Sequence, residues 1–278
     1  MEYETFFPKV EEIAKYFQKQ IKLKPKLLLV LTGGAHAFIE SLTERQEFHS
    51  SEIPHFPEAK AEGHTGKIIV GKFQKIPLIV MQGRYHYYEG HSPQAVVFPY
   101  FVFGRLGIKT VVTTNAVGGI NASYEPGDIV LVKDHINMMF KNPLIGIAIQ
   151  REKNQFTSMV DAYDEDLRKL ALEVAKEQGL NMPEAVYMGV TGPSYETKAE
   201  IKAFRALGAD TIGMSSIFEV IACKYLRQKL LTINCITNHA ADIHRGEMKH
   251  SDVLKEISKA QAKITKLLEA IIPRLQLT

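Results

Sequence analysis

Several polar side chains capable of chemistry stand directly behind a short apolar run. The run PLIVM at 77–81 leads into QGRYHYYEG, which holds Arg84, His86, Tyr88 and Glu89. The planar guanidinium of arginine suits phosphate or carboxylate oxygens, and a residue two positions further on points to the same side of an extended segment. The pattern indicates an anion site at the end of a strand. Its plainer interpretation is a surface arginine beside a histidine that has a partner of its own.

Four other apolar runs end in the same manner. They lead into TNAVGG at 114–119, TGPSYET at 191–197, GMSSIFE at 213–219 and TNHAAD at 237–242. In α/β proteins the carboxyl ends of strands are where ligands bind, because side chains converge there on a crevice. We therefore expect these segments to face one common site.

The elements that must position these residues alternate along the chain. Apolar runs bounded by glycine or polar residues predict strands at 26–31, 67–73, 75–83, 110–115, 128–137, 185–192, 209–214 and 229–238. Helical periodicity and end signals predict helices at 93–107, 164–179, 197–207 and 217–227, and a long last helix capped by Ser251. The segments at 67–73 and 75–83 are too close for a helix between them and predict a hairpin. The order indicates the α/β class, with one domain over residues 1–278 and a mixed sheet wrapped by helices.

Composition excludes several other classes of protein. The net charge of +3 is a small difference between 34 basic and 31 acidic residues, without a long run of like charge, which argues against a nucleic-acid partner. No apolar stretch reaches membrane-spanning length, and the first residues do not resemble a signal peptide. Cys223 and Cys235 lie in apolar segments, as reduced core thiols do. These features predict a cytoplasmic protein with no membrane partner.

The glycine turn after the first strand excludes one enzyme class. A dinucleotide-dependent oxidoreductase needs the spacing G-x-G-x-x-G and an acidic residue about 20 positions later. TGGAHA at 32–37 does not have this spacing.

The motifs GRYHYYEGH, TNAVGGIN, YEPGDIVLVKDHIN, PSYETKAE, GADTIGMSS and CITN resemble those of the trimeric purine nucleoside phosphorylases, the family that also contains methylthioadenosine phosphorylase. The resemblance runs from about Gly63 to the last helix, except near 140–160. It implies a single α/β domain around a twisted, partly barrel-like sheet, assembled as a homotrimer. It also implies reversible phosphorolysis of purine nucleosides in purine salvage, with inorganic phosphate as co-substrate and neither a metal nor a cofactor.

For phosphate, the resemblance implies Arg84, His86, the backbone of Ala116, and Ser215. The exposed N–H groups of a glycine-rich turn at NAVGG would suit an anion. Family members usually carry a serine in the glycine turn after the first strand, where this chain has Gly33. Either Thr32 supplies that hydroxyl or the turn binds through its backbone alone.

For the ribose, the resemblance implies Tyr88 and Met214, with His250 near the 5′-hydroxyl and the backbone of Ala116 alongside. Core filling is the plainer interpretation of a methionine, and an exposed side chain that of a histidine before a helix. The family's neighbouring subunit also lends an aromatic ring to the ribose. The region 151–156 is the expected source, with Phe156 as a candidate.

For the purine, the resemblance implies Glu196, Asn238, Tyr195 and Thr237. Cleavage of the N-glycosidic bond gives the sugar oxocarbenium character and builds charge on the departing base, so a donor near the five-membered ring is needed. The Asn238 amide can donate and accept across N7 and the 6-oxo group, and Thr237 can brace it. Glu196 can accept from N1–H and a 2-amino group while Tyr195 lies against the ring. Asn238, His86 and Glu196 are thus the candidate catalytic residues, with Glu89 orienting His86.

Two alternatives remain at this point. A methylthioadenosine phosphorylase is disfavoured by Asn238, because the adenosine-type branch of the family has aspartate there, and by the GRYHYYEG motif. A purine-binding protein without turnover is suggested only by the missing serine at Gly33.

Overall fold

The computed structural model describes residues 3–31, 36–60, 65–148, 156–243 and 250–277. Within these ranges the chain forms one mixed sheet, with the spatial order β2-β3-β4-β1-β5-β8-β7-β6-β9. Its strands are β1 (Leu27–Leu31), β2 (Thr43–His49), β3 (Lys67–Phe73), β4 (Ile76–Gln82), β5 (Thr110–Gly119), β6 (Ile129–Asn137), β7 (Glu184–Gly189), β8 (Thr211–Gly213) and β9 (Lys229–His239). The predicted hairpin is confirmed, since β3 and β4 pair antiparallel.

Part of the sheet closes on itself. β5 pairs with β8 and also with β9, so the five strands β5, β8, β7, β6 and β9 form a closed barrel-like unit. β1 joins this unit to the open part of the sheet by pairing in parallel with both β4 and β5. The predicted α/β fold with a mixed, partly barrel-like sheet is confirmed.

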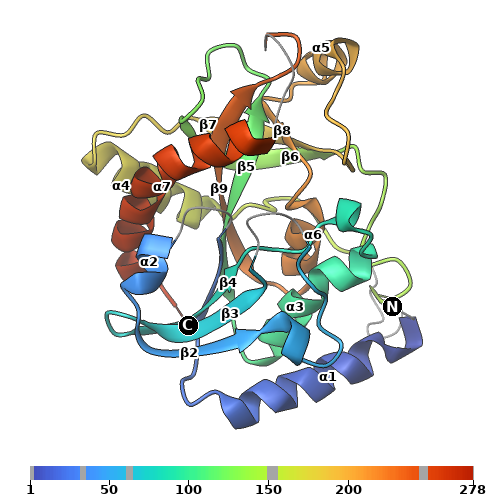
Figure 1. The fold of residues 1–278 in the computed structure, drawn as a ribbon, viewed down its shortest axis with the longest axis vertical. Coiled ribbons are helices and arrows are strands. Elements are labelled where there is room, and N and C mark those ends of the chain that lie inside the picture. The colour runs from blue at the N-terminus through green and yellow to red at the C-terminus, as the bar shows by residue number, and fades with distance from the viewer. Residues whose placement is uncertain (1–2, 32–35, 61–64, 149–155, 244–249, 278) are drawn as a thin grey trace.

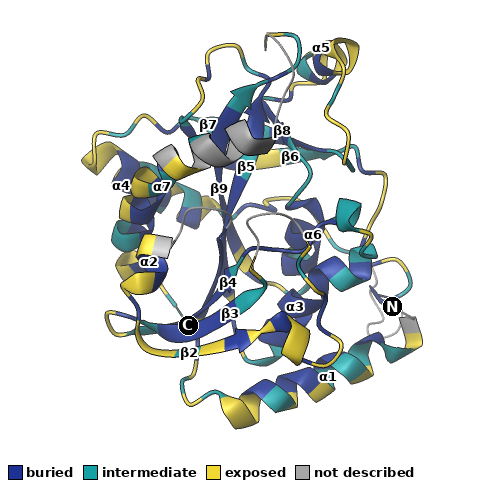
Figure 2. Ribbon diagram, in the orientation of Figure 1, coloured by how far each residue is buried: buried dark blue, intermediate teal, exposed yellow. Residues whose placement is uncertain are grey.

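Helices cover both faces of the sheet (Figure 1). They are α1 (Tyr3–Gln20), α2 (His36–Glu40), α3 (Pro93–Arg105), α4 (Glu165–Glu177), α5 (Lys198–Ala206), α6 (Ile217–Tyr225) and α7 (His250–Ile271). One apolar cluster unites side chains of α1, α3 and α6 with one face of the strands, and a second unites α4 and α7 with the other. Figure 2 shows the result: the central strands and the helices α3 and α6 are buried, while α1, α4 and α5 have exposed outer faces and the edge strand β2 is exposed.

Several boundaries differ from those expected. The strand predicted at 110–115 runs on to Gly119, so NAVGG is not a turn but part of β5. Glycine is disfavoured in strands, but here it leaves room for neighbours: a Cβ on Gly118 would lie 3.2 Å from Asn238 Nδ2 and from Ile212 Cγ2. The prediction of a turn at this place is therefore wrong.

The remaining differences are smaller. Ser251 lies inside α7 rather than at its cap, and α6 ends at Tyr225 instead of 227. The sequence did not predict α2 or β2. β2 lies at the edge of the sheet, where mostly exposed side chains leave no apolar pattern to recognise. No helix among the described residues is long and apolar enough to cross a membrane.

Candidate active site

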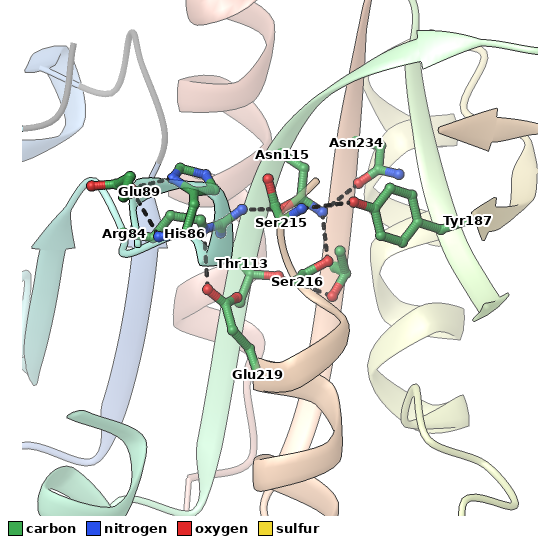
Figure 3. A network of polar contacts seen from close by, with 11 residues as sticks. Arg84, His86, Glu89, Thr113, Asn115, Tyr187, Ser215, Ser216, Glu219 and Asn234 are labelled. Carbon is green, nitrogen blue, oxygen red and sulfur yellow. Dashed lines mark hydrogen bonds and ion pairs between the residues drawn. The ribbon is translucent and has the colours of Figure 1, made fainter. Parts of the chain in front are cut away.

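Arg84 lies at the centre of a buried polar network (Figure 3). It follows the end of β4, where Gly83 turns the chain at a φ of 103°. Its side chain is only 1% exposed, its Nε lies 3.2 Å from Glu219 Oε1, and its Nη1 donates to Asn115 Oδ1. A buried guanidinium needs charged and polar partners, because desolvation of an unpaired charge costs several kcal/mol. The network meets that need with one carboxylate and one amide.

Asn115 connects Arg84 to the neighbouring elements. Its Nδ2 donates to Ser216 Oγ at 3.0 Å and to Asn234 Oδ1 at 2.8 Å. Asn234, on β9, donates in turn to Thr211 Oγ1 on β8 at 3.4 Å. Because Ser216 directly follows Ser215, this amide ties the predicted phosphate residues of two distant motifs into one cluster.

His86 is held from behind by Glu89, as the sequence predicts. The Glu89 Oε1 atom lies 2.7 Å from His86 Nδ1 and accepts the His86 backbone N–H at 2.8 Å. Glu89 Oε2 accepts the backbone N–H of Lys60 at 2.6 Å. The imidazole stacks on the Tyr88 ring with centroids 4.6 Å apart. A carboxylate at Nδ1 leaves Nε2 as the ring nitrogen that can exchange a proton with a ligand.

Burial and the Glu89 contact shift the pKa of His86 in opposite directions. Burial lowers the pKa of His86, while the Glu89 carboxylate works to raise it. For Glu89 itself, burial works to raise the pKa, but the hydrogen bonds from His86 and Lys60 outweigh it and lower the pKa to about 2. Glu89 is therefore ionised at neutral pH.

Ser215 stands in a short segment fixed by Tyr187. The Ser215 N–H donates to Tyr187 Oη at 3.1 Å, and the Tyr187 side chain is fully buried on β7. The pKa of Tyr187 is raised, mainly by burial. The charges of Glu219 and Glu196 add to this shift, while the Ser215 N–H and Arg84 oppose it. Tyr187 thus lies within electrostatic reach of both the Arg84 network and Glu196.

Asn238 lies against β5 near the end of β9. Thr237 Oγ1 donates to Asn238 Oδ1 at 2.9 Å, which confirms the predicted bracing contact, and Asn238 Nδ2 donates to the His239 carbonyl at 3.0 Å. Gly118 admits the amide, as its missing side chain leaves the space that Asn238 Nδ2 occupies.

The loop after β7 brings Glu196 and Tyr195 to the same region. A Cβ on Gly192 would lie 2.2 Å from Met214 Sδ, so Met214 packs directly on this loop. Thr197 then caps α5 by accepting the N–H of Glu200. Burial raises the pKa of the half-buried Glu196. Burial also raises the pKa of Tyr88 to about 12, and the charges of Glu89 and Tyr195 add to that shift.

Some predicted site residues are not placed in this cluster. Thr32 and Gly33 lie outside the described residues, as does the side chain of His250, so their roles stay predictions. Ala116 lies within β5 and is half-buried. Phe156 is 85% exposed.

The sequence predicted no role for four members of the network. These are Asn115, Tyr187, Glu219 and Asn234. The sequence pattern that could have indicated them is a polar residue inside an otherwise apolar segment, as in LLTINCITN or IFEVIACKY. Buried polar groups need partners, so such positions mark a network even before its geometry is known.

The cluster combines two kinds of chemistry. A guanidinium, an imidazole and a hydroxyl suit an anion, while an amide and a half-buried carboxylate suit the polar edge of a heterocyclic ring. Within the described ranges no group of histidine, cysteine and acidic residues could hold a metal ion.

Comparison with known proteins gives one consistent result. The family model described as the Phosphorylase superfamily matches residues 29–273. The purine nucleoside phosphorylase 1 of Geobacillus stearothermophilus is 38% identical over 263 residues, covering 95% of this chain and 96% of that protein. The purine nucleoside phosphorylase of Bos taurus is 37% identical over 273 residues, covering 95% and 94%.

Solved structures agree with the sequences. The crystal structure of Schistosoma mansoni purine nucleoside phosphorylase in complex with inosine matches with a TM-score of 0.86 at 32% identity, covering 96% of both chains. The same enzyme in complex with adenosine matches with a TM-score of 0.87, also at 32% identity, covering 96% of this chain and 97% of that one.

The Glu89 contact predicts a pH-dependent contribution to stability. A carboxyl whose pKa falls from 4.5 to about 2 on folding stabilises the native state above pH 4.5, and this contribution is lost as pH falls from 4.5 toward 2. Glu89→Gln should therefore lower the free energy of unfolding at pH 6, and the gap to the unmodified protein should close below pH 4.5. Urea unfolding at a series of pH values measures this gap. The exposed Glu52→Gln is the control, and a gap that stays constant down to pH 2.5 would contradict the assignment.

Proposed function

We propose that this chain, which belongs to the purine nucleoside phosphorylases of the Phosphorylase superfamily, binds phosphate with Arg84, His86 and Ser215 and the purine with Glu196 and Asn238. Its activity is the reversible phosphorolysis of purine nucleosides to free base and ribose 1-phosphate. The observation that supports these roles is the network that ties Arg84 to the Ser215 segment through Asn115.

The phosphate residues surround the nucleophile in this proposal. A phosphate oxygen forms the new bond to C1′ of the ribose while the bond from C1′ to N9 breaks, and its electron pair leaves with the purine. Arg84 supplies a charged planar donor, Ser215 a hydroxyl and Ala116 a backbone N–H. His86 Nε2 exchanges a proton with phosphate, since Glu89 occupies Nδ1. These donors hold the phosphate in line with the bond that breaks.

The nucleoside residues stabilise the sugar and the leaving base. Tyr88 and Met214 cover the ribose, and His250 is assigned to its 5′-hydroxyl. Asn238 donates to N7, where negative charge develops in the transition state, and thereby lowers the barrier to cleavage. The Glu196 carboxylate accepts from N1–H, as a 6-oxopurine requires.

We propose a preference for 6-oxopurine nucleosides such as inosine and guanosine, with 2′-deoxy forms as further substrates. An amide at position 238 can both accept and donate, whereas the aspartate of the adenosine-type branch favours a 6-amino group. The Thr237 hydroxyl occupies Asn238 Oδ1 and so fixes the orientation of this amide. Methylthioadenosine phosphorylase and a purine-binding protein without turnover are the alternatives.

We also propose a homotrimer. Four apolar side chains between 140 and 160 are strongly exposed: Phe140 79%, Ile145 62%, Phe156 85% and Val160 72%. Several exposed large apolar side chains in one segment of the chain favour an interface there, because water contact with them is unfavourable. Phe156 remains the candidate aromatic that one subunit lends to the ribose site of the next.

The co-substrate, the lack of a cofactor and the cellular location are proposed on chemical grounds. Phosphate is the co-substrate, and no metal or cofactor enters the proposed reaction. Both cysteines are buried and free, as suits the reducing cytoplasm, where purine salvage takes place. Cell fractionation that places the protein elsewhere would contradict this location.

The activity predicts a simple requirement for phosphate. The protein should release hypoxanthine from inosine only when phosphate is present, and EDTA should not change the rate. Coupled oxidation of hypoxanthine measures its release. Bound purine without release would favour a binding protein, and a higher kcat/KM for 5′-methylthioadenosine than for inosine would favour the other phosphorylase.

The role of Asn238 predicts a change of base preference. Asn238→Asp should lower kcat/KM for inosine about a hundredfold, because an ionised carboxylate cannot donate to N7, and should raise kcat/KM for adenosine. The exposed Asn181→Asp makes the same chemical change away from the site and should leave both constants unchanged. An unaltered preference in Asn238→Asp would remove this residue from the site.

The exposed apolar segment predicts the assembly. Light scattering at micromolar concentration should give about three times the chain mass of 31.3 kDa. Phe140→Asp should lower this mass, whereas Leu207→Asp, at another exposed apolar position, should not. A monomer mass for the unmodified protein would refute the trimer.

A further inference from the structure

The carboxylate of Glu219 is unusual for its surroundings. Glu219 is the charged member of a buried run in α6, whose other members are Ile217, Phe218, Val220, Ile221, Ala222 and Cys223. Its side chain is 1% exposed, as is that of Arg84, and the two are 3.2 Å apart. A buried ion pair is often no more stabilising than apolar residues of the same size. Stability alone therefore gives weak reason for a charge at this position.

Two contacts flank the Arg84 guanidinium. The Glu219 carboxylate forms an ion pair with it, with Oε1 3.2 Å from Nε, and Asn115 Oδ1 accepts a hydrogen bond from Nη1. Rotation of the Asn115 amide would break two hydrogen bonds, because its Nδ2 donates to Ser216 Oγ and to Asn234 Oδ1. Arg84 is thus oriented by two groups that are themselves fixed by β5, β9 and α6.

The Glu219 carboxylate also affects the pKa of groups packed around it. Burial raises the pKa of Tyr100 on α3 and of Cys223 one turn further along α6, and the Glu219 carboxylate adds to both shifts. The carboxylate therefore lies where α6 packs against α3, with Arg84 as its cationic partner.

We propose that Glu219 is a positioning residue for phosphorolysis, which holds the Arg84 guanidinium in the orientation that receives phosphate. The inference rests on the proposed role of Arg84 in phosphate binding. It predicts the direction in which the KM for phosphate changes when Glu219 is removed. By its charge alone, a carboxylate near a phosphate site should weaken phosphate binding. Removing a mere repelling charge would lower the KM for phosphate, whereas removing the group that orients Arg84 raises it.

Three variants separate these possibilities. Glu219→Leu removes the acceptor and should raise the phosphate KM about tenfold or more, with the inosine KM within about twofold. Glu219→Gln keeps an acceptor oxygen of the same reach and should restore the phosphate KM to within about threefold of the unmodified enzyme. Glu184→Leu removes the carboxylate of the partly buried Arg168–Glu184 pair and should leave both KM values within about twofold.

Several outcomes would overturn the proposal. A folded Glu219→Leu enzyme with an unchanged or lowered phosphate KM shows that Arg84 needs no such support. Equal effects of Leu and Gln show that charge rather than orientation matters. A matching rise in inosine KM, or in the Glu184→Leu control, shows a general loss of structure.

Arg84→Lys distinguishes failure of the inference from failure of the proposed function. Lysine keeps the charge but lacks the planar set of donors, so the phosphate KM should rise. If it does not rise, the phosphate role of Arg84 is wrong. If it rises while Glu219→Leu has no effect, only the inference about Glu219 is wrong.

A measurement on the unmodified protein decides the case if Glu219→Leu does not fold. The arginine Nε–H signals are recorded by NMR without phosphate, and the Arg84 signal is identified by its loss in Arg84→Lys. A side chain already held by Glu219 should show an Nε–H that exchanges slowly with water. Exchange as fast as that of an exposed arginine, slowing only when inorganic phosphate is added, would overturn the proposal.

Discussion

The parallel pairing of β5 with β9 is the constraint on which the site depends. It extends from Thr110 opposite Lys229 to Gly119 opposite His239, with one register shift after Val117. The first half of β5 also pairs with β1, and its end pairs with β8, so one strand belongs to both the open and the closed part of the sheet. Asn115 is on β5 and Asn238 on β9, so the buried Arg84 network and the amide proposed to bind the base share this one pair of strands.

Close approach between elements depends on missing side chains at two strand ends. Gly118 gives room to the Asn238 amide, and Gly189 gives room to the start of α6, where a Cβ would lie 2.2 Å from Ile217 Cγ1. Because α6 begins so close to the end of β7, its first turn carries Glu219 beneath Arg84. A larger residue at position 189 would clash with the Ile217 side chain at the start of this helix.

The sequence predicted what depends on local patterns. Apolar runs placed most strands, and the Glu89 contact with His86 followed from a carboxylate three residues after a histidine. The continuation of β5 through NAVGG was missed, because glycines ordinarily signal a turn and only the presence of β8 and β9 makes them strand residues. Glu219 was missed for a similar reason, since its partner Arg84 lies far away along the chain and no local pattern links them.

The charges of the network constrain how the proposed phosphate site works. Arg84 is paired with Glu219, and His86 with Glu89, so these four side chains carry no net positive charge. Attraction must then come from donors that already point at the phosphate oxygens, since such donors need no reorganisation when the ligand arrives. In the proposed reaction, oriented donors favour the geometry in which a phosphate oxygen approaches C1′. The proposed role of the two carboxylates behind Arg84 and His86 is to maintain that orientation.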